Sequence, residues 1–385
     1  MRILLWAPLG AGTHYWGPGT SAFRLYNRGL PCRYSVSLAH GCTEQEDFKQ
    51  VYSQQFKIYT INRNNPFTQL CFIYKGNYWL KKNHANFDVF HGIGAFQTTF
   101  GPAIRWAKFG KPSFLKVTGS SGGVEDSSFY SKMLGFSRQR ERQANMIKGY
   151  IAISTDIREK LINFGVHPEK VHLIPNGVDT RIFRPAELEE KLRLRRNLNI
   201  PNISTFIFVG GLTPNKQQFK CVQAIHRLIN IGYNVQLILL GPDRSKGEEL
   251  DKIEGYLSKY PSLRSRILHV SFSATPELYY RCADYFILTS KKEGMPNALL
   301  EAMATRLPCL VTPTSGSTDL VIDKVSGLLV NDTIDEITES CKHMLDSPEA
   351  AQKMALEAFS LIIKEYSSEI VLDKHLKLFE AYGRF

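Results

Sequence analysis

The sequence predicts an α/β protein of two domains, each built around a parallel, doubly wound sheet. Three observations lead to this fold class. The chain has 385 residues, a length that favours two domains over one. Short apolar runs alternate with segments of helical periodicity. Several runs end in glycine, as at 204–211 and 234–241. Such alternation is typical of sheets covered by helices on both faces.

The second half of the chain contains the clearer series of elements. Its predicted strands are STFIFVGG (204–211), NVQLILLG (234–241), RILHVSF (266–272), ADYFILTS (283–290) and LPCLVTPT (307–314). Its predicted helices cover 219–231, 276–281 and 297–305. Because ligands of doubly wound sheets bind beyond the carboxyl ends of the strands, we expect a site at the turns that follow these strands.

The first half repeats this pattern less clearly. Its predicted strands are RILLWAP (2–8), YSVSLAH (34–40), FKIYT (56–60), FDVFHG (87–92), PSFLKVTG (112–119), YIAIS (150–154) and VHLIPNG (171–177). We interpret the first run as a buried strand and not as a signal peptide. It is short, lacks an A-x-A cleavage site and is followed at once by glycines.

A turn-rich segment, IPNGVDTRIFRP (174–185), joins the two halves. We therefore expect an N-terminal domain over 1–178 and a C-terminal domain over 179–365. Apolar residues at helical spacing predict a final helix within 366–385 that packs back on the first domain. Two such domains facing each other would form a cleft with strand ends on both walls.

Cysteine usage and hydropathy limit the class of protein. The seven cysteines are scattered and include no C-x-x-C pair. This pattern argues against a disulfide framework or a zinc site and favours a reducing compartment. No uninterrupted apolar stretch is long enough to span a bilayer. We therefore expect a cytoplasmic protein.

The excess positive charge lies in the first half of the chain. The net charge is +12. Residues 1–178 contain 22 Lys and Arg against 10 Asp and Glu, whereas residues 179–385 contain 26 of each kind. This asymmetry indicates a surface that meets anions: phosphates, acidic glycans, anionic lipid or nucleic acid.

The segment SKKEGMPNALLEAMA (290–304) carries two glutamates around the start of a helix. Pro296 suits the first helical position, and the amides of the loop before it would form a site for anions or polarised oxygens. Glu293 lies ahead of the helix and Glu301 within it, so both can reach one ligand. Alternatively, they are a helix-start acid and a solvated surface glutamate.

This segment resembles the E-x7-E motif of retaining glycosyltransferases of the GT-B fold, in particular the large family 4. FDVFHG (87–92) also resembles the family's strand that ends in histidine. The resemblance covers the second domain nearly completely and the first loosely. Further matches in family order are IPNGVD (174–179), FVGGLTPNKQ (208–217), LLGPD (239–243), ELYYRCADYFILTSKKEG (277–294) and SGSTDLVIDKVSGLLV (315–330).

The resemblance implies a donor site for a nucleotide-diphosphate sugar in the second domain. Glu301 would bind the ribose, and Glu293 the hydroxyls of the transferred sugar. Lys216 would neutralise the diphosphate, whose charge develops as it leaves. The remaining donor-site candidates are Gly294, Met295 and Asn297 in the loop before the helix, and Gly211, Gly241 and Ser273 in turns after strands.

The first domain also contributes candidate residues. Glycines after the first strand would let a phosphate or an acceptor approach the backbone closely; alternatively, they form a flexible turn. The candidates for this phosphate and acceptor loop are Gly12, Gly17, Gly19 and Thr118. His91 is a catalytic candidate beside Glu293 and Lys216, although a histidine at a strand end can also be a structural hydrogen-bonder.

Two positions depart from the family pattern. The family usually has a diphosphate-binding arginine at the position of Gly211, and Arg24 and Lys116 are candidates to replace it. The family often has a histidine after the fifth strand, where this chain reads KVTGSSGG (116–123). His91 is the candidate to compensate.

The sequence contains no D-x-D pair and no His/Asp/Glu cluster with metal-ligand spacing. We therefore expect a metal-independent site without a cofactor, in which Lys216 and helix N-termini replace a divalent ion. The resemblance implies retention of the anomeric configuration by a front-face mechanism. The donor would be a UDP- or GDP-linked hexose-type sugar, as in the synthesis of cell-surface polysaccharides or glycoconjugates.

In this fold the first domain holds the acceptor, a glycan, a lipid-linked glycan or another hydroxyl. Its positive charge favours an anionic acceptor and peripheral contact with the inner membrane face. The segment RNNPFTQLCFIYKGNYWLKKN (63–83) mixes aromatic residues with Lys75, Lys81 and Lys82, as an interfacial helix does. Alternatively, this helix packs its aromatic residues under the sheet.

Other functions fit the sequence less well. An epimerase would need acid–base residues facing the sugar from the first domain, and a phosphorylase would need a pyridoxal-phosphate lysine and a longer chain. No recognised nucleic-acid-binding module occurs, so we do not expect a nucleic-acid partner. A non-catalytic protein that binds sugar nucleotides or an anionic polymer on the same fold stays open as the alternative.

Overall fold

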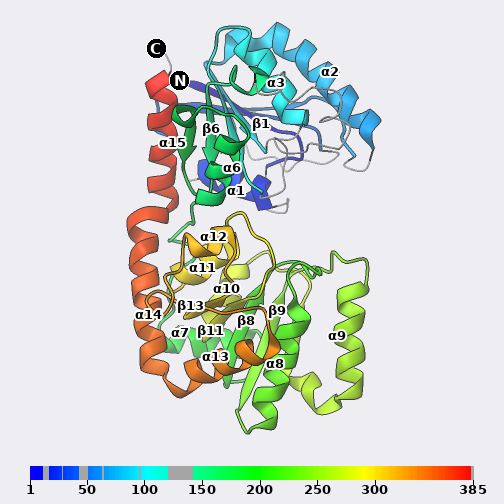
Figure 1. The fold of residues 1–385 in the computed structure, drawn as a ribbon, viewed down its shortest axis with the longest axis vertical. Helices are drawn as coiled ribbons and strands as arrows, with labels where there is room; N and C mark the ends of the chain where they lie inside the picture. Colours follow the sequence, from blue (N-terminus) through cyan, green and yellow to red (C-terminus); the bar gives the residue numbers. More distant parts are fainter. Residues whose placement is uncertain are drawn as a thin grey trace. The chain divides into compact units, whose positions relative to one another are not determined.

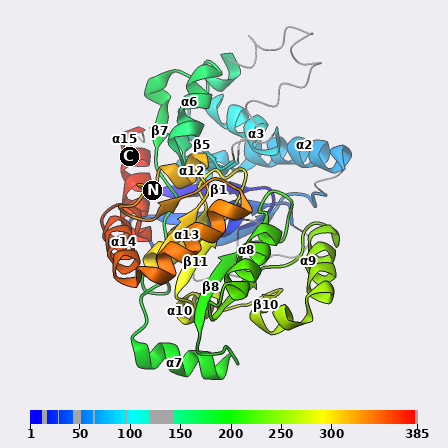
Figure 2. The same ribbon diagram turned by 60° about the horizontal axis from the view of Figure 1, so that its bottom comes forward.

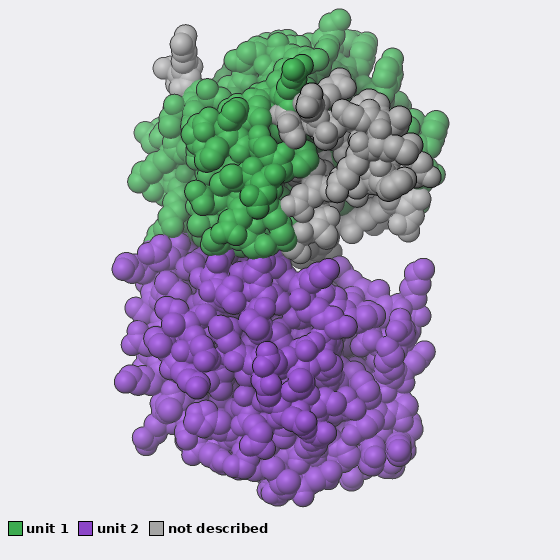
Figure 3. All heavy atoms as spheres, in the orientation of Figure 1, with its two compact units in different colours: residues 1–177, 368–385 green, residues 178–367 purple. Residues whose placement is uncertain are grey.

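The computed structural model describes residues 1–11, 17–27, 29–42, 51–62, 65–94, 97–119 and 142–382. The chain forms two compact units, drawn in separate colours in Figure 3. Unit 1 comprises Met1–Gly177 and Ser368–Phe385, and unit 2 comprises Val178–Ser367. The chain thus leaves unit 1 one residue before the boundary that the sequence suggests, and it returns after the whole of unit 2.

Unit 1 is built on a parallel sheet with the strand order β3-β2-β1-β4-β5-β6-β7. Parallel strands covered on both faces are continuous apolar runs, which is why the sequence pattern finds them. Their bounds are β1 Arg2–Ala7, β2 Ser35–His40, β3 Gln54–Lys57, β4 Val89–Ile93, β5 Ser113–Val117, β6 Gly149–Ala152 and β7 Val171–Leu173.

Five α-helices of unit 1 lie within the described residues: α1 Gly17–Tyr26, α2 Pro66–Asn83, α3 Gln97–Ala107, α6 Thr155–Asn163 and α15 Ser368–Tyr382. The long helix α2 begins where the side chain of Asn65 accepts a hydrogen bond from the amide of Phe67 at 3.0 Å. Helix α15 belongs to this unit because its Val371 and Phe379 are fully buried in the core that includes Ile3 of β1. The predicted return of the last helix to the first sheet is therefore seen in the structure.

Unit 2 is built on a second parallel sheet with the strand order β10-β9-β8-β11-β12-β13. Five of these strands coincide with predicted runs, whereas the two-residue strand β13 has no run of its own in the sequence. Their bounds are β8 Ser204–Val209, β9 Val235–Leu240, β10 Ile267–Val270, β11 Tyr285–Leu288, β12 Cys309–Val311 and β13 Leu328–Leu329.

Helices surround the strands of unit 2 (Figure 1). They are α7 Leu188–Asn197, α8 Gln218–Asn230, α9 Glu248–Lys259, α10 Pro276–Cys282, α11 Asn297–Ala304, α12 Ser315–Thr318, α13 Ile334–Asp346 and α14 Pro348–Leu361. In the described ranges of both units, no helix combines the length and the apolar character that crossing a membrane requires.

The order of the strands in unit 2 fixes where a ligand can bind. Strand β8 pairs with β9 on one side and with β11 on the other, so the chain direction of the crossovers reverses between β8 and β11. Doubly wound sheets bind their ligands at such a switch point, beyond the carboxyl ends of the strands. The residues that follow β8 and β11 are therefore the first place to look for a site.

Candidate active site

Hydrogen bonds join the loop after β8 to the loop after β11. The backbone amide of Lys291 donates to the carbonyl oxygen of Asn215 at 2.8 Å, and the side-chain amide of Asn215 donates to the carbonyl oxygen of Lys292 at 3.0 Å. The hydroxyl of Thr289 donates to the carbonyl oxygen of Lys216 at 3.2 Å. These contacts hold Lys216 beside the end of β11.

The Lys216 ammonium forms an ion pair with the Glu293 carboxylate across these two loops. The side chains are 22% and 13% exposed, so solvent screens the pair less than it screens a surface pair. Both groups lie at the switch point of the sheet, as the sequence analysis expects for a donor site. A partly exposed cation and anion side by side can receive a phosphate and a hydroxyl of one ligand.

The loop between Glu293 and helix α11 is held in place by the neighbouring helix α12. The hydroxyl of Ser315 donates to the carbonyl oxygen of Glu293 at 2.7 Å. Gly316 packs so closely that a Cβ atom at this position would lie 2.2 Å from the carbonyl oxygen of Gly294 and 2.4 Å from the Cα atom of Met295. Only glycine fits this contact. Helix α12 therefore determines the course of the loop.

Helix α11 begins at Asn297, as the predicted range 297–305 has it. Pro296 has an extended backbone and occupies the N-cap position, so its predicted place as the first helical residue is wrong by one position. Met295 is buried, whereas Gly294 and Asn297 are half-buried. The buried side chain of Met295 thus fixes the loop to the apolar core. The amides at the positive end of α11 begin only a few residues after Glu293 in the sequence.

Glu301 lies on the buried side of α11 and is 5% exposed. Its carboxylate accepts a hydrogen bond from the hydroxyl of Tyr280 at 2.7 Å. The alternative of a solvated helix glutamate is therefore wrong for Glu301. A carboxylate that is buried and hydrogen-bonded is oriented before a ligand arrives, which suits the recognition of a diol such as ribose.

The glycines at the ends of β8 and β9 allow the two turns to approach each other. Gly241 has a φ of 149°, and a Cβ atom there would lie 2.4 Å from the carbonyl oxygen of Gly210. Gly211 follows Gly210 at the same strand end. Ser273 has a local role, since its hydroxyl accepts a hydrogen bond from the amide of Thr275 just before α10, at 3.1 Å.

His91 lies in the core of unit 1 and has no exposed surface. Its Nδ1 atom is 2.7 Å from the hydroxyl of Tyr26, and its ring packs against Phe379 with 5.3 Å between the ring centroids. Burial is the main cause that holds the pKa of His91 well below its ordinary value, followed by repulsion between its protonated form and the protonated forms of His375 and Lys116. Because a fully buried ring cannot contact a substrate, the prediction of a catalytic His91 is wrong, and the alternative of a structural hydrogen-bonder fits it.

The residues predicted to form a phosphate and acceptor loop in unit 1 do not all lie in a loop. Gly12 lies outside the described residues. Gly17 and Gly19 belong to the first turn of helix α1 and not to a loop, so this prediction is wrong in its local structure. Thr118 directly follows the carboxyl end of β5 and is half-buried.

Two residues of unit 2 shape the site although the sequence analysis assigned them no role. Tyr280 orients Glu301, and Gly316 fixes the loop after Glu293. Both lie in segments of the sequence that resemble the glycosyltransferase family. Their distance along the chain from Glu293 and Glu301, however, does not indicate that they contact these glutamates or the loop between them. Within the described residues, no group of three or more His, Cys, Asp and Glu side chains is arranged as metal ligands.

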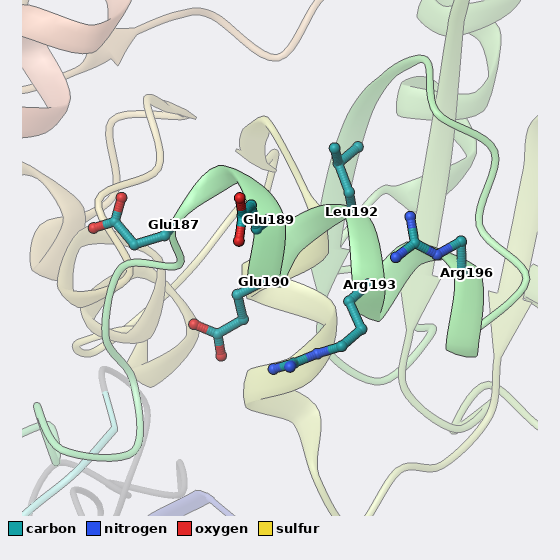
Figure 4. Close-up of a pocket in the computed structure, with 6 residues that line it drawn as sticks. All are labelled: Glu187, Glu189, Glu190, Leu192, Arg193 and Arg196. Carbon is teal, nitrogen blue, oxygen red and sulfur yellow. The ribbon is translucent and has the colours of Figure 1, made fainter.

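A surface hollow of about 560 Å³ lies along helix α7. Figure 4 shows its side chains, which are Glu187, Glu189, Glu190, Leu192, Arg193 and Arg196. Helix α7 lies toward the end of the sheet at which β8 begins (Figure 2). Its Arg195 donates to the Asp284 carboxylate, which also accepts a hydrogen bond from the amide of Thr205 at the start of β8. The hollow is therefore at the opposite end of the sheet from the ion pair.

Comparison with known families and structures is consistent with this geometry. The family model described as Glycosyl transferases group 1 matches residues 190–360, and the model described as Glycosyltransferase Family 4 matches residues 17–182. Among solved structures, Anabaena HepE in complex with UDP superposes with a TM-score of 0.78 at 17% identity, over 99% of this chain and 100% of that chain. The chain belongs to the group 1 glycosyltransferases of the GT-B fold.

A second solved structure has the same fold. Sucrose-phosphate synthase from Thermosynechococcus elongatus has a TM-score of 0.79 at 18% identity, over 99% of this chain and 98% of that chain. At these identities the two structures show the GT-B fold alone.

Two curated glycosyltransferases are similar in sequence to this chain. UDP-Gal:alpha-D-GlcNAc-diphosphoundecaprenol alpha-1,3-galactosyltransferase of Escherichia coli is 33% identical over 172 residues, which are 43% of this chain and 42% of that protein. The capsular polysaccharide biosynthesis glycosyltransferase CapM of Staphylococcus aureus is 22% identical over 60% of this chain and 61% of that protein. The match thus spans less than two thirds of the length of either relative.

Proposed function

We propose that the protein is a retaining glycosyltransferase that moves a hexose-type sugar from a UDP- or GDP-linked donor to a hydroxyl of a glycan or of a lipid-linked acceptor. The observation that carries this proposal is the Lys216–Glu293 ion pair at the switch point of the unit 2 sheet, with the buried Glu301 on the helix that follows. The printed names of the relatives, which concern undecaprenol-linked and capsular glycans, support polysaccharide or glycoconjugate synthesis.

Each of these three residues has a distinct task in the proposed reaction. Lys216 stabilises the negative charge that grows on the diphosphate as the bond between its oxygen and the anomeric carbon breaks. Glu293 accepts hydrogen bonds from hydroxyls of the sugar and orients it. Glu301, fixed by Tyr280, accepts hydrogen bonds from the ribose hydroxyls. The amides at the start of α11 add positive potential near the sugar and phosphate oxygens.

The proposed reaction retains the configuration at the anomeric carbon by a front-face route. The acceptor oxygen bonds to the anomeric carbon on the face from which the diphosphate departs. The acceptor proton passes to an oxygen of the departing phosphate, so the reaction needs no nucleophile from the protein. Since Lys216 and the helix end supply the positive charge, we expect turnover to persist in the presence of EDTA.

A donor panel tests the proposal. Purified protein is incubated with UDP-glucose, UDP-galactose and GDP-mannose, with and without EDTA, and released UDP or GDP is measured alongside nucleotide affinity. We expect Glu301→Ala to weaken nucleotide binding roughly tenfold to a hundredfold. Glu293→Ala chiefly lowers turnover, by about a hundredfold. Glu357→Ala, an exposed glutamate on α14, is the matched control and behaves like the parent.

The outcomes separate the two candidate functions. Turnover of one donor that depends on Glu293 supports a transferase. Binding without turnover by the intact protein supports a non-catalytic sugar-nucleotide binding protein on the same fold. Turnover by both glutamate variants at the parental rate would contradict the assignment of the site.

We also propose that helix α2 of unit 1 contacts an anionic membrane surface. Four of its apolar or aromatic side chains are 58–76% exposed, namely Phe67, Leu70, Tyr74 and Tyr78. Their spacing puts them on one face of the helix, while Phe72 and Leu80 point to the core. The alternative that the helix packs its aromatic residues under the sheet is therefore wrong for most of them, although Phe72 is buried. Exposed lysines follow in the last turn of the helix, a composition that suits anionic lipid.

Vesicle sedimentation tests the membrane contact. The intact protein is mixed with vesicles of phosphatidylcholine, either alone or with about 30% phosphatidylglycerol. We expect binding to the anionic vesicles that weakens with salt and falls in the double variant Phe67→Ser/Leu70→Ser. The control Leu356→Ser/Ile363→Ser changes exposed apolar residues of unit 2 and leaves binding unchanged. Equal binding by all three proteins would contradict a role for α2.

A further inference from the structure

The side chain of Arg244 covers Gly211 at the carboxyl end of β8. A Cβ atom on Gly211 would lie 3.0 Å from the Cδ atom and 3.2 Å from the Cγ atom of Arg244. On the preceding residue, a Cβ atom of Gly210 would lie 3.6 Å from the Cε atom and 3.8 Å from the Nζ atom of Lys216. Two long cationic side chains therefore lie against two consecutive glycines at the same strand end.

The loop that carries Arg244 is fixed by its own hydrogen bonds. The carboxylate of Asp243 accepts the backbone amides of Ser245 and Gly247 at 2.9 Å and 2.6 Å. The backbone of this loop also pairs with the turn after β8. The amide of Leu212 donates to the carbonyl oxygen of Pro242 at 2.9 Å, and the amide of Arg244 donates to the carbonyl oxygen of Leu212 at 3.0 Å. Arg244 is thus presented by an ordered loop, which lowers the entropy lost when it binds.

The charge balance at this strand end leaves Arg244 available for an anion. Lys216 is already paired with Glu293, so these two side chains together carry no net charge. Arg244 is exposed, and within the described part of the chain its guanidinium has neither a carboxylate partner nor a hydrogen-bond acceptor. Arg244 therefore adds a positive charge that the Lys216–Glu293 pair does not supply to a diphosphate approaching Lys216.

We propose that Arg244 binds the diphosphate of the donor together with Lys216, and so replaces the arginine that relatives usually have at the position of Gly211. This inference rests on the proposed function of the same site. A guanidinium forms two parallel hydrogen bonds with phosphate oxygens, which an ammonium cannot do. The aliphatic part of the Arg244 side chain occupies space that a larger residue at position 211 would fill. The absence of a side chain at Gly211 therefore allows Arg244 to lie at this strand end.

The two replacements suggested by the sequence do not fit this role as well. Lys116 is 1% exposed in the core of unit 1, where its ammonium donates to the hydroxyl of Ser21 at 3.4 Å. A ligand cannot reach it there. Arg24 lies on helix α1, also in unit 1, and has a partner of its own. Arg244, in contrast, is in the same unit as Lys216 and Glu293.

Calorimetric titration of the full chain tests this assignment. The parent is titrated with UDP, GDP and ADP, and the diphosphate that binds most tightly is compared with its nucleoside. We expect Arg244→Ala to weaken diphosphate binding roughly tenfold to a hundredfold while nucleoside binding stays the same. Arg244→Lys retains part of the affinity. In the Arg244→Ala background, Gly211→Arg regains affinity, because the removed stem leaves room for the new side chain.

A second arginine variant controls for the general loss of one positive charge from unit 2. Arg196→Ala removes an arginine that is also exposed and lies at the amino end of the same sheet, and it is expected to bind like the parent. Parental diphosphate affinity in Arg244→Ala would overturn the assignment of Arg244 alone. An equal loss of nucleoside affinity would also overturn it, since it would indicate structural damage. If the parent binds none of the three diphosphates, the proposed function falls, and this inference falls with it.

Discussion

Replacing Lys116 by methionine is expected to stabilise unit 1 strongly at pH 7 and only slightly at pH 10. The amine lies in the core near Ser21 of α1, and the rings of His91 on β4 and His375 on α15 also face this interior. Burial lowers the pKa of Lys116 to about 7 from the ordinary 10.5 of a lysine. The unfolded chain therefore binds a proton between pH 7 and pH 10.5 that the folded unit does not.

The size of the effect follows from linkage. For a base whose pKa is lowered by folding, the cost of burial is absent above the unfolded pKa and complete below the folded pKa. With these two values, burying Lys116 costs about 4 kcal/mol at pH 7 and about 1 kcal/mol at pH 10. Methionine has a similar length and no charge, so it removes this cost. The histidines do not confuse the comparison, because burial holds the pKa of His375 at about 3 and that of His91 well below its ordinary value.

Tryptophan fluorescence during urea unfolding measures the effect on unit 1 alone, because all four tryptophans lie between residues 6 and 106. The free energy of unfolding of the Lys116→Met variant is compared with that of the parent at pH 7 and pH 10. The exposed Lys108→Met change is the control and should give equal differences at both pH values. A stabilisation by Lys116→Met that is the same at pH 7 and pH 10, or a destabilisation at pH 7, would refute the reasoning.

Three further predictions concern unit 2. Tyr280→Phe removes the hydroxyl that donates to Glu301 and is expected to lower nucleotide affinity about fivefold, the effect of one hydrogen bond of about 1 kcal/mol, in a titration with UDP or GDP. Gly316→Ala forces the loop at Gly294 to move and should reduce turnover at least tenfold while lowering the free energy of unfolding by about 1–3 kcal/mol; unchanged turnover would show that the loop position is unimportant. Arg306 has a φ of 58° after helix α11, so Arg306→Gly should raise the free energy of unfolding by about 0.5–1 kcal/mol, measured by thermal unfolding.

The sequence predicts those parts of the fold whose signal is local. Strands such as β8 and β9 are buried on both faces, so they appear as apolar runs that end at glycine. The pairing of Lys216 with Glu293 agrees with the expectation that both belong to one site. The proximity of strand ends in a parallel sheet is a general consequence of the fold class, and it needs no knowledge of individual contacts.

The parts that the sequence does not predict depend on contacts between distant residues. Gly17 and Gly19 disfavour helix by intrinsic propensity, yet they lie in α1. His91 stands at the end of an apolar run, and only the packing of α15 shows that it is enclosed. The role proposed for Arg244 depends on the space beside Gly211, which lies in the turn after a different strand, and no local pattern connects the two positions.

The late position of α15 in the chain has a consequence for biosynthesis. Unit 1 lacks part of its core until residues such as Val371 and Phe379 have been made, whereas unit 2 is a continuous segment that is synthesised before them. The amide of Val178, where unit 2 begins, donates to the carbonyl oxygen of Tyr366 near its end at 2.9 Å. Unit 2 can therefore close on itself as it emerges from the ribosome. The sheet of unit 1, although translated earlier, keeps part of its apolar face uncovered until α15 has been made, which exposes that face to aggregation during synthesis.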